Sequence, residues 1–185
     1  MRIVGGDQRG RRLATPKTDA IRPTSDRLRE AVFNVLAHAY DDAVVGARVL
    51  DLFAGTGALS FEALSRGAAY ALLVDEGAEA RGLIRENIEA FGAEGRTRLF
   101  RRDATRLGPV GTSGTFGLVF CDPPYGRDLA PAALASAASG GWLLPGALVV
   151  VEETASVAVA LPSGFSELER RVYGDTAVAF ARFAG

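Results

Sequence analysis

The sequence predicts an α/β protein with a mostly parallel, Rossmann-like sheet that ends in an antiparallel hairpin. From Ala47 onward, apolar runs of strand length alternate with segments of helical length, which is typical of a parallel sheet covered on both faces. Two of the apolar runs end in a carboxylate followed by a turn rich in glycine or proline. The last two runs are joined through Gly174-Asp175, which favours a hairpin.

Composition places this chain among soluble globular proteins. Its 185 residues are 48% hydrophobic, which suits one domain with a small appendage. No run approaches the ~20 apolar residues that cross a bilayer. Met1–Gly6 lacks the apolar core of a signal peptide. The single Cys121 excludes an intramolecular disulfide and a cysteine-rich metal cage. We therefore expect a cytoplasmic monomer without a membrane partner.

Charge is distributed unevenly along the chain. The net charge is −1, but residues 1–29 hold eight basic groups against three acidic ones, and the remainder has 13 basic and 19 acidic groups. A basic arm on an acidic body favours a polyanionic partner at one end, although a solvated tail is an open alternative. We divide the chain into a basic hairpin or arm, 1–23, and a main domain, 24–185.

The N-terminal segments predict a hairpin, a linker and a helix. Met1–Val4 can pair with Arg11–Ala14 around a glycine-rich turn, and Pro16–Pro23 is extended. A helix over Asp26–Tyr40 follows, capped by Thr24 or Ser25 and carrying apolar residues at helical spacing. We interpret His38 as a surface or helix-end residue.

The sheet and its helices follow in alternation. Each expected strand is a short apolar run, and the first two helices below stop at Gly67 and Gly92. The expected strands are Arg48–Phe53, Tyr70–Val74, Thr97–Arg101, Phe116–Cys121, Ala147–Glu152, Glu167–Tyr173 and Ala177–Phe183. The expected helices are Ala58–Arg66, Ala78–Phe91 and Leu129–Ser139.

The turn after the first strand, Asp51–Gly57, is a candidate cofactor site. Gly55 and Gly57 let the backbone approach a ligand, and Phe53 lies in the same turn. The third glycine of a dinucleotide fingerprint is absent, because Ser60 occupies its place. Asp51, near the strand end, suits an ammonium or sulfonium group better than a pyrophosphate.

Two further carboxylates end the next two strands. Asp75 can accept both hydroxyls of a ribose, and Asp103 can accept an adenine amino group. Together with Asp51 they suit a ligand with an adenosine and a positively charged amino-acid end. S-adenosylmethionine is such a ligand. Ordinary helix capping by solvated carboxylates is the open alternative.

The turn after the fourth strand is a candidate substrate site. Pro123 and Pro124 fix two φ angles and leave rigid carbonyl acceptors, while Asp122 adds a carboxylate and Tyr125 a stacking face. Such acceptors suit the exocyclic NH₂ group of a nucleobase, held flat by the aromatic ring. Hydrogen bonds to Asp122 and the Pro123 carbonyl would turn the nitrogen lone pair toward a methyl donor. Cys121 is interpreted as a core thiol, and no metal site is expected.

Five segments together resemble a known family. They are Met1–Gly6, Arg9–Leu13, Arg22–Asn34, Asp51–Gly57 and Asp122–Tyr125. The chain is similar to the bacterial 16S ribosomal RNA guanine-N2 methyltransferases, which have the class I S-adenosylmethionine-dependent fold. The last two motifs are shared with other amino-group methyltransferases, including DNA adenine enzymes, whereas the N-terminal segments single out this family.

The resemblance implies methyl transfer from S-adenosylmethionine to the N2 amine of a guanine in 16S rRNA, in the small ribosomal subunit or its assembly intermediate. It implies that Asp51, Gly55 and Gly57 line the cofactor pocket, with Asp75 at the ribose and Asp103 at the adenine. It implies that Asp122 and Tyr125 hold the guanine with the Pro123 carbonyl. Phosphate contacts are expected from Arg2, Arg9, Arg11, Arg12, Arg22 and Arg27. The alternatives are a DNA adenine-N6 methyltransferase and a non-catalytic RNA-binding assembly factor.

Overall fold

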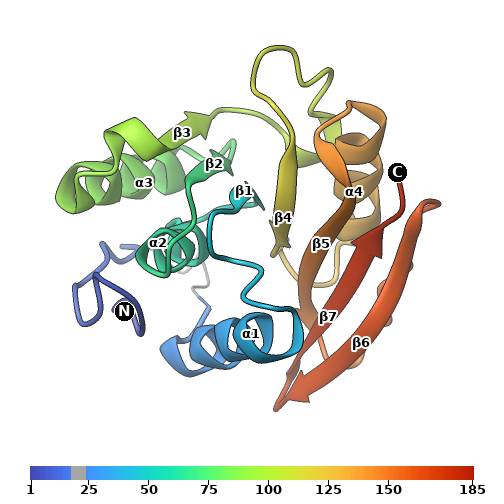
Figure 1. Ribbon diagram of the computed structural model, residues 1–185, viewed down its shortest axis with the longest axis horizontal. Coiled ribbons are helices and arrows are strands. Elements are labelled where there is room, and N and C mark those ends of the chain that lie inside the picture. The colour runs from blue at the N-terminus through green and yellow to red at the C-terminus, as the bar shows by residue number, and fades with distance from the viewer. Residues whose placement is uncertain (18–23) are drawn as a thin grey trace.

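The computed structural model describes residues 1–17 and 24–185, and its centre is a twisted sheet of seven strands in the order β3-β2-β1-β4-β5-β7-β6 (Figure 1). Strands β1 to β5 run parallel, while β7 is antiparallel to both β5 and β6. The predicted fold class and its C-terminal hairpin are therefore confirmed. The strands are β1 Arg48–Leu52, β2 Tyr70–Val74, β3 Thr97–Phe100, β4 Phe116–Cys121, β5 Leu143–Thr154, β6 Phe165–Tyr173 and β7 Thr176–Phe183.

Most element bounds agree with the sequence pattern to within two residues. The main difference is β5, which begins at Leu143 rather than Ala147 because Leu143 pairs with Phe116 ahead of a register shift. Pro145 and Gly146 interrupt the apolar run and hide this extension in the sequence. The helices of the described residues are α1 Asp26–Ala39, α2 Ala58–Ser65, α3 Ala78–Phe91 and α4 Leu129–Ser139, with 3₁₀ turns η1 Glu94–Arg96 and η2 Ala104–Arg106.

The sheet is covered on both faces. Figure 1 shows α1, α2 and α3 along one face and α4 against the other. Alternate residues of each strand enter different hydrophobic clusters, as the two-residue period of a strand requires. Val49 and Leu73 pack with the α1–α3 side, whereas Leu50 and Leu72 pack with Trp142 on the α4 side. Both clusters leave the carboxyl ends of the parallel strands accessible.

The N-terminal arm is a hairpin packed on the body of the protein. Arg2 and Arg12 form an antiparallel bridge, and the Ile3 N–H donates to the Arg11 carbonyl at 3.0 Å. Ile3 and Leu13 are only 1% and 4% exposed and belong to the core. Their burial gives the arm about 1.5–3 kcal/mol of hydrophobic stabilisation per side chain.

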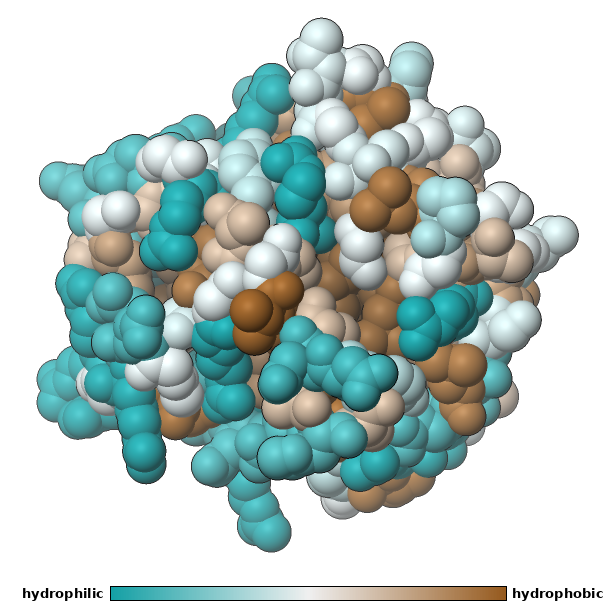
Figure 2. Space-filling model, in the orientation of Figure 1, coloured by the Kyte–Doolittle hydropathy of each residue, from teal (hydrophilic) through white to brown (hydrophobic). Residues whose placement is uncertain are grey.

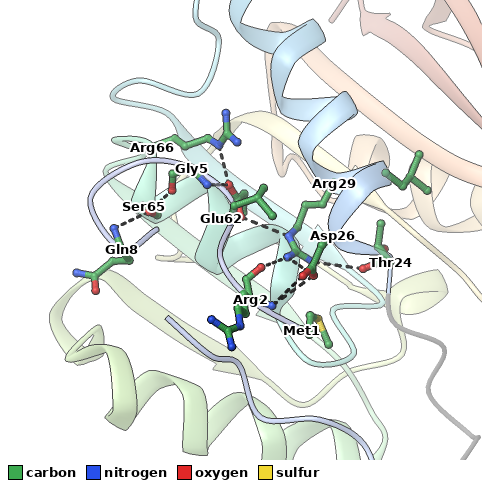
Figure 3. Close-up of polar contacts among 12 residues, drawn as sticks. Met1, Arg2, Gly5, Gln8, Thr24, Asp26, Arg29, Glu62, Ser65 and Arg66 are labelled. Carbon is green, nitrogen blue, oxygen red and sulfur yellow. Dashed lines mark hydrogen bonds and ion pairs between the residues drawn. The ribbon is translucent and has the colours of Figure 1, made fainter. Parts of the chain in front are cut away.

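A buried ionic network fastens this arm to α1 and α2 (Figure 3). Glu62 of α2, whose side chain is wholly buried, accepts from the N–H groups of Val4 and Gly5, both at 2.9 Å. The same carboxylate accepts from Arg66 Nε at 2.7 Å and from Arg29 Nε at 3.3 Å. Four donors around one buried carboxylate satisfy it completely, and they join three segments distant in sequence.

Glycine allows the arm to approach α2 this closely. A Cβ at Gly6, where φ is +75°, would lie 1.9 Å from the Ser65 carbonyl oxygen. The Gln8 N–H also donates to Ser65 Oγ at 2.9 Å.

Figure 2 shows hydrophilic side chains over the side of the molecule where Figure 1 places this arm and α3. In the described part of the chain, every helix falls short of the length and apolarity that a membrane span needs.

Candidate functional site

One cavity of about 870 Å³ opens at the carboxyl ends of the central strands, where an open α/β sheet binds its ligands. Both predicted loops line it, which brings the candidate cofactor and substrate sites into one space. Seven of the predicted site residues are in its wall: Asp51, Phe53, Gly55, Asp75, Asp122, Pro123 and Tyr125. Gly57 and Asp103 are outside the wall, although neighbours of both contribute to it.

The turn between β1 and α2 has an unusual backbone. Phe53 has φ +62°, a left-handed conformation that costs a non-glycine residue about 1–3 kcal/mol, and Gly55 and Gly57 have φ +59° and +79°. A Cβ at Gly57 would lie 2.7 Å from the ring of Phe61, so this glycine permits close packing beneath the turn. The first two residues of α2, Ala58 and Leu59, follow this turn and line the cavity.

Asp51 is a buried carboxylate in the wall of the cavity. It is 1% exposed, and Ser60 Oγ donates to its Oδ2 at 2.6 Å. Burial, together with the charge of Asp75, raises the pKa of Asp51 to about 7. A buried, ionised carboxylate without a counter-charge is unfavourable, and a positively charged ligand group would stabilise it.

Asp75 fixes the same turn from the end of β2. Its Oδ2 accepts from the Gly55 N–H at 2.9 Å, and its Oδ1 accepts from the Gly77 N–H at 2.8 Å. Each carboxylate oxygen has a second lone pair, so Asp75 retains capacity for ligand hydroxyls. Its first contribution is therefore to shape the backbone that meets the ligand.

Asp103 has a local partner. Its Oδ1 accepts from the N–H and the hydroxyl of Thr105, at 2.8 and 2.7 Å, and so caps η2. These hydrogen bonds hold the pKa of Asp103 below its usual value. Arg102 and Ala104, on either side of it, line the cavity.

The Asp122–Tyr125 loop follows β4, which pairs with β1, and it shares the cavity wall with Asp51. Pro123 is buried, while Asp122 and Tyr125 are half-buried. Burial, followed by the charge of Glu152, raises the pKa of Asp122 well above its ordinary value. The Tyr125 hydroxyl donates to Glu152 Oε1 at 2.5 Å, which fixes the ring, and burial raises the pKa of this phenol too.

Two residues of the site, Thr24 and Glu152, were not among the site residues predicted from the sequence. Thr24 Oγ1 lies 3.1 Å from Asp122 Oδ2 and 3.2 Å from Glu152 Oε2. Ser25 takes the helix cap instead, accepting from the Leu28 N–H at 3.1 Å. Glu152 had a usable signal, because it ends the expected strand Ala147–Glu152 much as Asp51 and Asp75 lie at or just after the ends of theirs. Thr24 had none, since its partner lies 98 residues away.

The remaining candidates behave as surface or core groups. Cys121 is buried, and burial raises the pKa of its thiol, which confirms a core residue. His38 is exposed in the last turn of α1. Within residues 1–17 and 24–185, there is no cluster of three or more histidine, cysteine or acidic side chains that could hold a metal ion.

The predicted RNA-contacting arginines differ in their surroundings. Arg2, Arg9, Arg12 and Arg27 are exposed, while Arg22 lies outside the described residues. Arg11 is exposed but occupied, because it donates to Gln8 Oε1 and the Ala90 carbonyl and lies 4.7 Å from the centre of the Phe91 ring.

Four features together define a class I methyltransferase. They are the parallel sheet with an antiparallel last strand, the strained glycine turn after β1, the acid after β2, and the Asp-Pro-Pro-Tyr loop after β4. Solved structures agree with this class. An Escherichia coli methyltransferase, yhhF, superposes with a TM-score of 0.84 at 32% identity, covering 100% of this chain and 98% of that one.

Sequence comparison narrows the class to a family. The family model "Conserved hypothetical protein 95" matches residues 1–182. The ribosomal RNA small subunit methyltransferase D of E. coli K12 is 37% identical over 179 residues, which are 96% of this chain and 87% of that protein. Its Haemophilus influenzae namesake is 30% identical over 176 residues, or 94% and 89% of the two chains. The chain belongs to the ribosomal RNA small subunit methyltransferase D family.

Proposed function

We propose that this protein transfers a methyl group from S-adenosylmethionine to the exocyclic N2 amine of a guanine in the 16S rRNA of the small ribosomal subunit. The observation that carries the proposal is the single cavity, which joins the strained turn and its acids to the Asp122–Tyr125 loop. Family membership supplies the substrate class, because the relatives are named as methyltransferases of small-subunit ribosomal RNA.

The donor set of the cavity suits S-adenosylmethionine. This cofactor, when bound, supplies an electrophilic methyl group on a sulfonium centre. The buried Asp51 would neutralise its positively charged amino-acid end, and the remaining lone pairs of Asp75 would accept from its ribose. Asp103, with the neighbouring lining residues Arg102 and Ala104, is assigned to the adenine end.

The substrate loop acts by positioning. An exocyclic amine on a nucleobase is a poor nucleophile, because its lone pair is delocalised into the ring. Donating its two N–H groups to Asp122 and to the Pro123 carbonyl would direct that lone pair toward the methyl group. The Tyr125 ring, anchored through its hydroxyl to Glu152, would stack on the base and hold it flat.

Substrate RNA would reach this loop along the basic arm. In this proposal residues 1–23 contribute phosphate contacts, and residues 24–185 carry the cofactor and the chemistry. Among the arginines predicted to contact phosphates, Arg2, Arg9, Arg12 and Arg27 are better placed than Arg11, because the Arg11 guanidinium donates to the Ala90 carbonyl of α3. The protein would act as a cytoplasmic monomer on 16S rRNA, the small subunit or its assembly intermediate.

The test is methyl transfer from labelled S-adenosylmethionine to free 16S rRNA and to assembled small subunits. We expect Asp122→Ala to lower the rate about 10²–10³-fold, as the loss of one positioned polar group does, with cofactor affinity unchanged. Asp128→Asn is the matched control, because Asp128 is exposed at the start of α4 and has a φ of +52° that asparagine tolerates. An Asp122→Ala variant at the wild-type rate would refute the catalytic assignment.

A non-catalytic assembly factor would give a different result. It would bind small-subunit RNA without transferring label in the wild-type protein. A DNA adenine methyltransferase would label duplex DNA, supplied as a third substrate, and neither RNA substrate. The three readings therefore separate in one set of reactions.

A further inference from the structure

A continuous chain of oxygen atoms runs through the wall of the cavity. The Tyr125 hydroxyl contacts Glu152 Oε1 at 2.5 Å, Glu152 Oε2 lies 3.2 Å from Thr24 Oγ1, and Thr24 Oγ1 lies 3.1 Å from Asp122 Oδ2. The chain joins three parts of the fold: the residue before the Ser25 cap of α1, the loop after β4, and β5. It links both proposed base-holding side chains, Asp122 and Tyr125, through Glu152.

The number of protons available at Thr24 limits which hydrogen bonds these oxygen atoms can form. The Thr24 hydroxyl has one proton but lies between two carboxyl groups, and an ionised carboxylate can only accept. Thr24 makes two full, two-centre hydrogen bonds only if one of the carboxyls, Asp122 or Glu152, carries a proton; with both ionised, its single proton is shared between two anionic acceptors, which is a weaker arrangement. Two carboxyls this close to one hydroxyl also disfavour double ionisation.

The surroundings of Asp122 favour the same protonation state. The acids that act on it from the packed elements raise its pKa, in addition to burial. On the other side of Thr24, Arg29 of α1 donates to the Thr24 carbonyl rather than to the carboxyl pair. Among the described residues, the titratable groups with a charge interaction with Asp122 are Asp51 of β1, Cys121 of β4, Tyr125 of the loop, and Glu152 and Glu153 of β5.

Thr24 is held rigidly for this bridging position. Its carbonyl accepts from Arg29 Nη1 at 3.2 Å, and Arg29 is anchored by Glu62 and by Asp26, at 3.3 and 2.9 Å (Figure 3). Because Ser25 supplies the helix cap, the Thr24 hydroxyl is left to the site. The arm, which Arg29 also contacts at the Arg2 carbonyl, is thereby connected to the bridging hydroxyl.

We propose that Thr24 and Glu152 form with Asp122 a hydrogen-bonded acid pair that holds one proton, and that both are positioning residues for the target amine. This inference rests on the proposed function. When an amine donates to Asp122, Asp122 gives its proton to Thr24 while Thr24 gives its own to Glu152. Asp122 becomes an acceptor-only carboxylate, Glu152 becomes neutral, and the charge of the pair is unchanged. Tyr125 donates to Glu152 throughout.

The first test is made on the protein without substrate or cofactor. The Asp122 carboxyl is titrated by ¹³C NMR in wild type and in Glu152→Gln, with its signal assigned by its loss in Asp122→Asn. Glutamine keeps the size of the side chain but carries no charge and stores no proton. We expect the Asp122 titration to move to lower pH by at least one unit. An unchanged titration would overturn the proposal.

The second test separates positioning from folding. Thr24→Val removes the hydroxyl at constant shape, and we expect at least a tenfold loss of kcat with unchanged cofactor affinity, rescued by Thr24→Ser. Thr97→Val is the matched control, because its hydroxyl donates to the Ala93 carbonyl at 2.7 Å, outside the cavity wall. A Thr24→Val enzyme with the kcat of wild type would refute the bridging role. An inactive wild-type protein with a shifted titration would instead refute only the proposed function.

Discussion

Replacing Asp51 by asparagine tests whether the site stores an unfavourable charge for a ligand. Asp51 is 1% exposed, and burial is the main reason that its pKa rises from 3.8 to about 7. One pKa unit corresponds to about 1.4 kcal/mol, so the charged carboxylate costs the folded protein at most about 4 kcal/mol above pH 7.

The sign of the pH dependence follows from the raised pKa. Between pH 4 and 7 the folded protein keeps a proton on Asp51 that the unfolded chain releases. The contribution of this proton to the free energy of unfolding is therefore fully present below about pH 4, and it is lost as the pH rises through 7. Asparagine cannot ionise, and its Oδ1 can still accept from Ser60, but its buried NH₂ group costs about 1–3 kcal/mol at every pH.

The assay is urea unfolding at pH 4 and pH 8. Between pH 4 and pH 8, we expect the free energy of unfolding of the wild type to fall by about 2–4 kcal/mol more than that of Asp51→Asn. The cost of the buried amide is the same at both pH values, so it cancels in this comparison. Cofactor affinity, measured by calorimetry at pH 8, should fall about 10–100-fold in the variant, since a hydrogen bond to a charged group is lost. An effect of Asp51→Asn on stability that is equal at both pH values would refute the reasoning.

Three other substitutions test separate parts of the structure. Gly57→Ala should destabilise the protein by at least about 1 kcal/mol in urea, because φ is +79° and the new Cβ meets Phe61; an unchanged midpoint would contradict the packing. Glu62→Ala should cost about 3–5 kcal/mol, because it removes the acceptor of the buried Arg29 Nε and of the Val4 and Gly5 N–H groups; a surface-like loss below 1 kcal/mol would show that the network is dispensable. Arg12→Gln with Arg27→Gln should reduce the salt slope of RNA binding by about 1.4–1.8, and an unaltered slope would exclude both residues from phosphate contact.

The sequence predicts both loops and most of the sheet, the exception being the first part of β5, from Leu143 to Gly146. Strands such as Tyr70–Val74 and Phe116–Cys121 are uninterrupted apolar runs, and the structure has them at the predicted bounds. Because the carboxyl ends of parallel strands meet at one edge, Asp51, Asp75 and Asp122 could be expected to face the same cavity.

Long-range contacts of small polar groups could not be predicted. Thr24 reads as a helix cap in sequence, and only the fold brings its hydroxyl to Asp122 while Ser25 caps α1. The extent to which the arm packs on the body was also hidden, because Ile3 and Leu13 are isolated apolar residues in a basic segment. Because Ile3 and Leu13 of the arm are buried, removal of residues 1–22 would expose the core. Point substitutions of exposed arginines therefore test RNA binding without this loss of packing.

The identity of the methylated nucleoside tests the central claim most directly. The protein is incubated with labelled S-adenosylmethionine and unmethylated small-subunit RNA, and the RNA is then digested to nucleosides and separated by chromatography with mass detection. Methyl transfer at the Asp122–Tyr125 loop to guanine predicts N2-methylguanosine as the labelled product, absent with Asp122→Ala. Label in N6-methyladenosine, or RNA that stays unlabelled with wild-type protein, would contradict the claim.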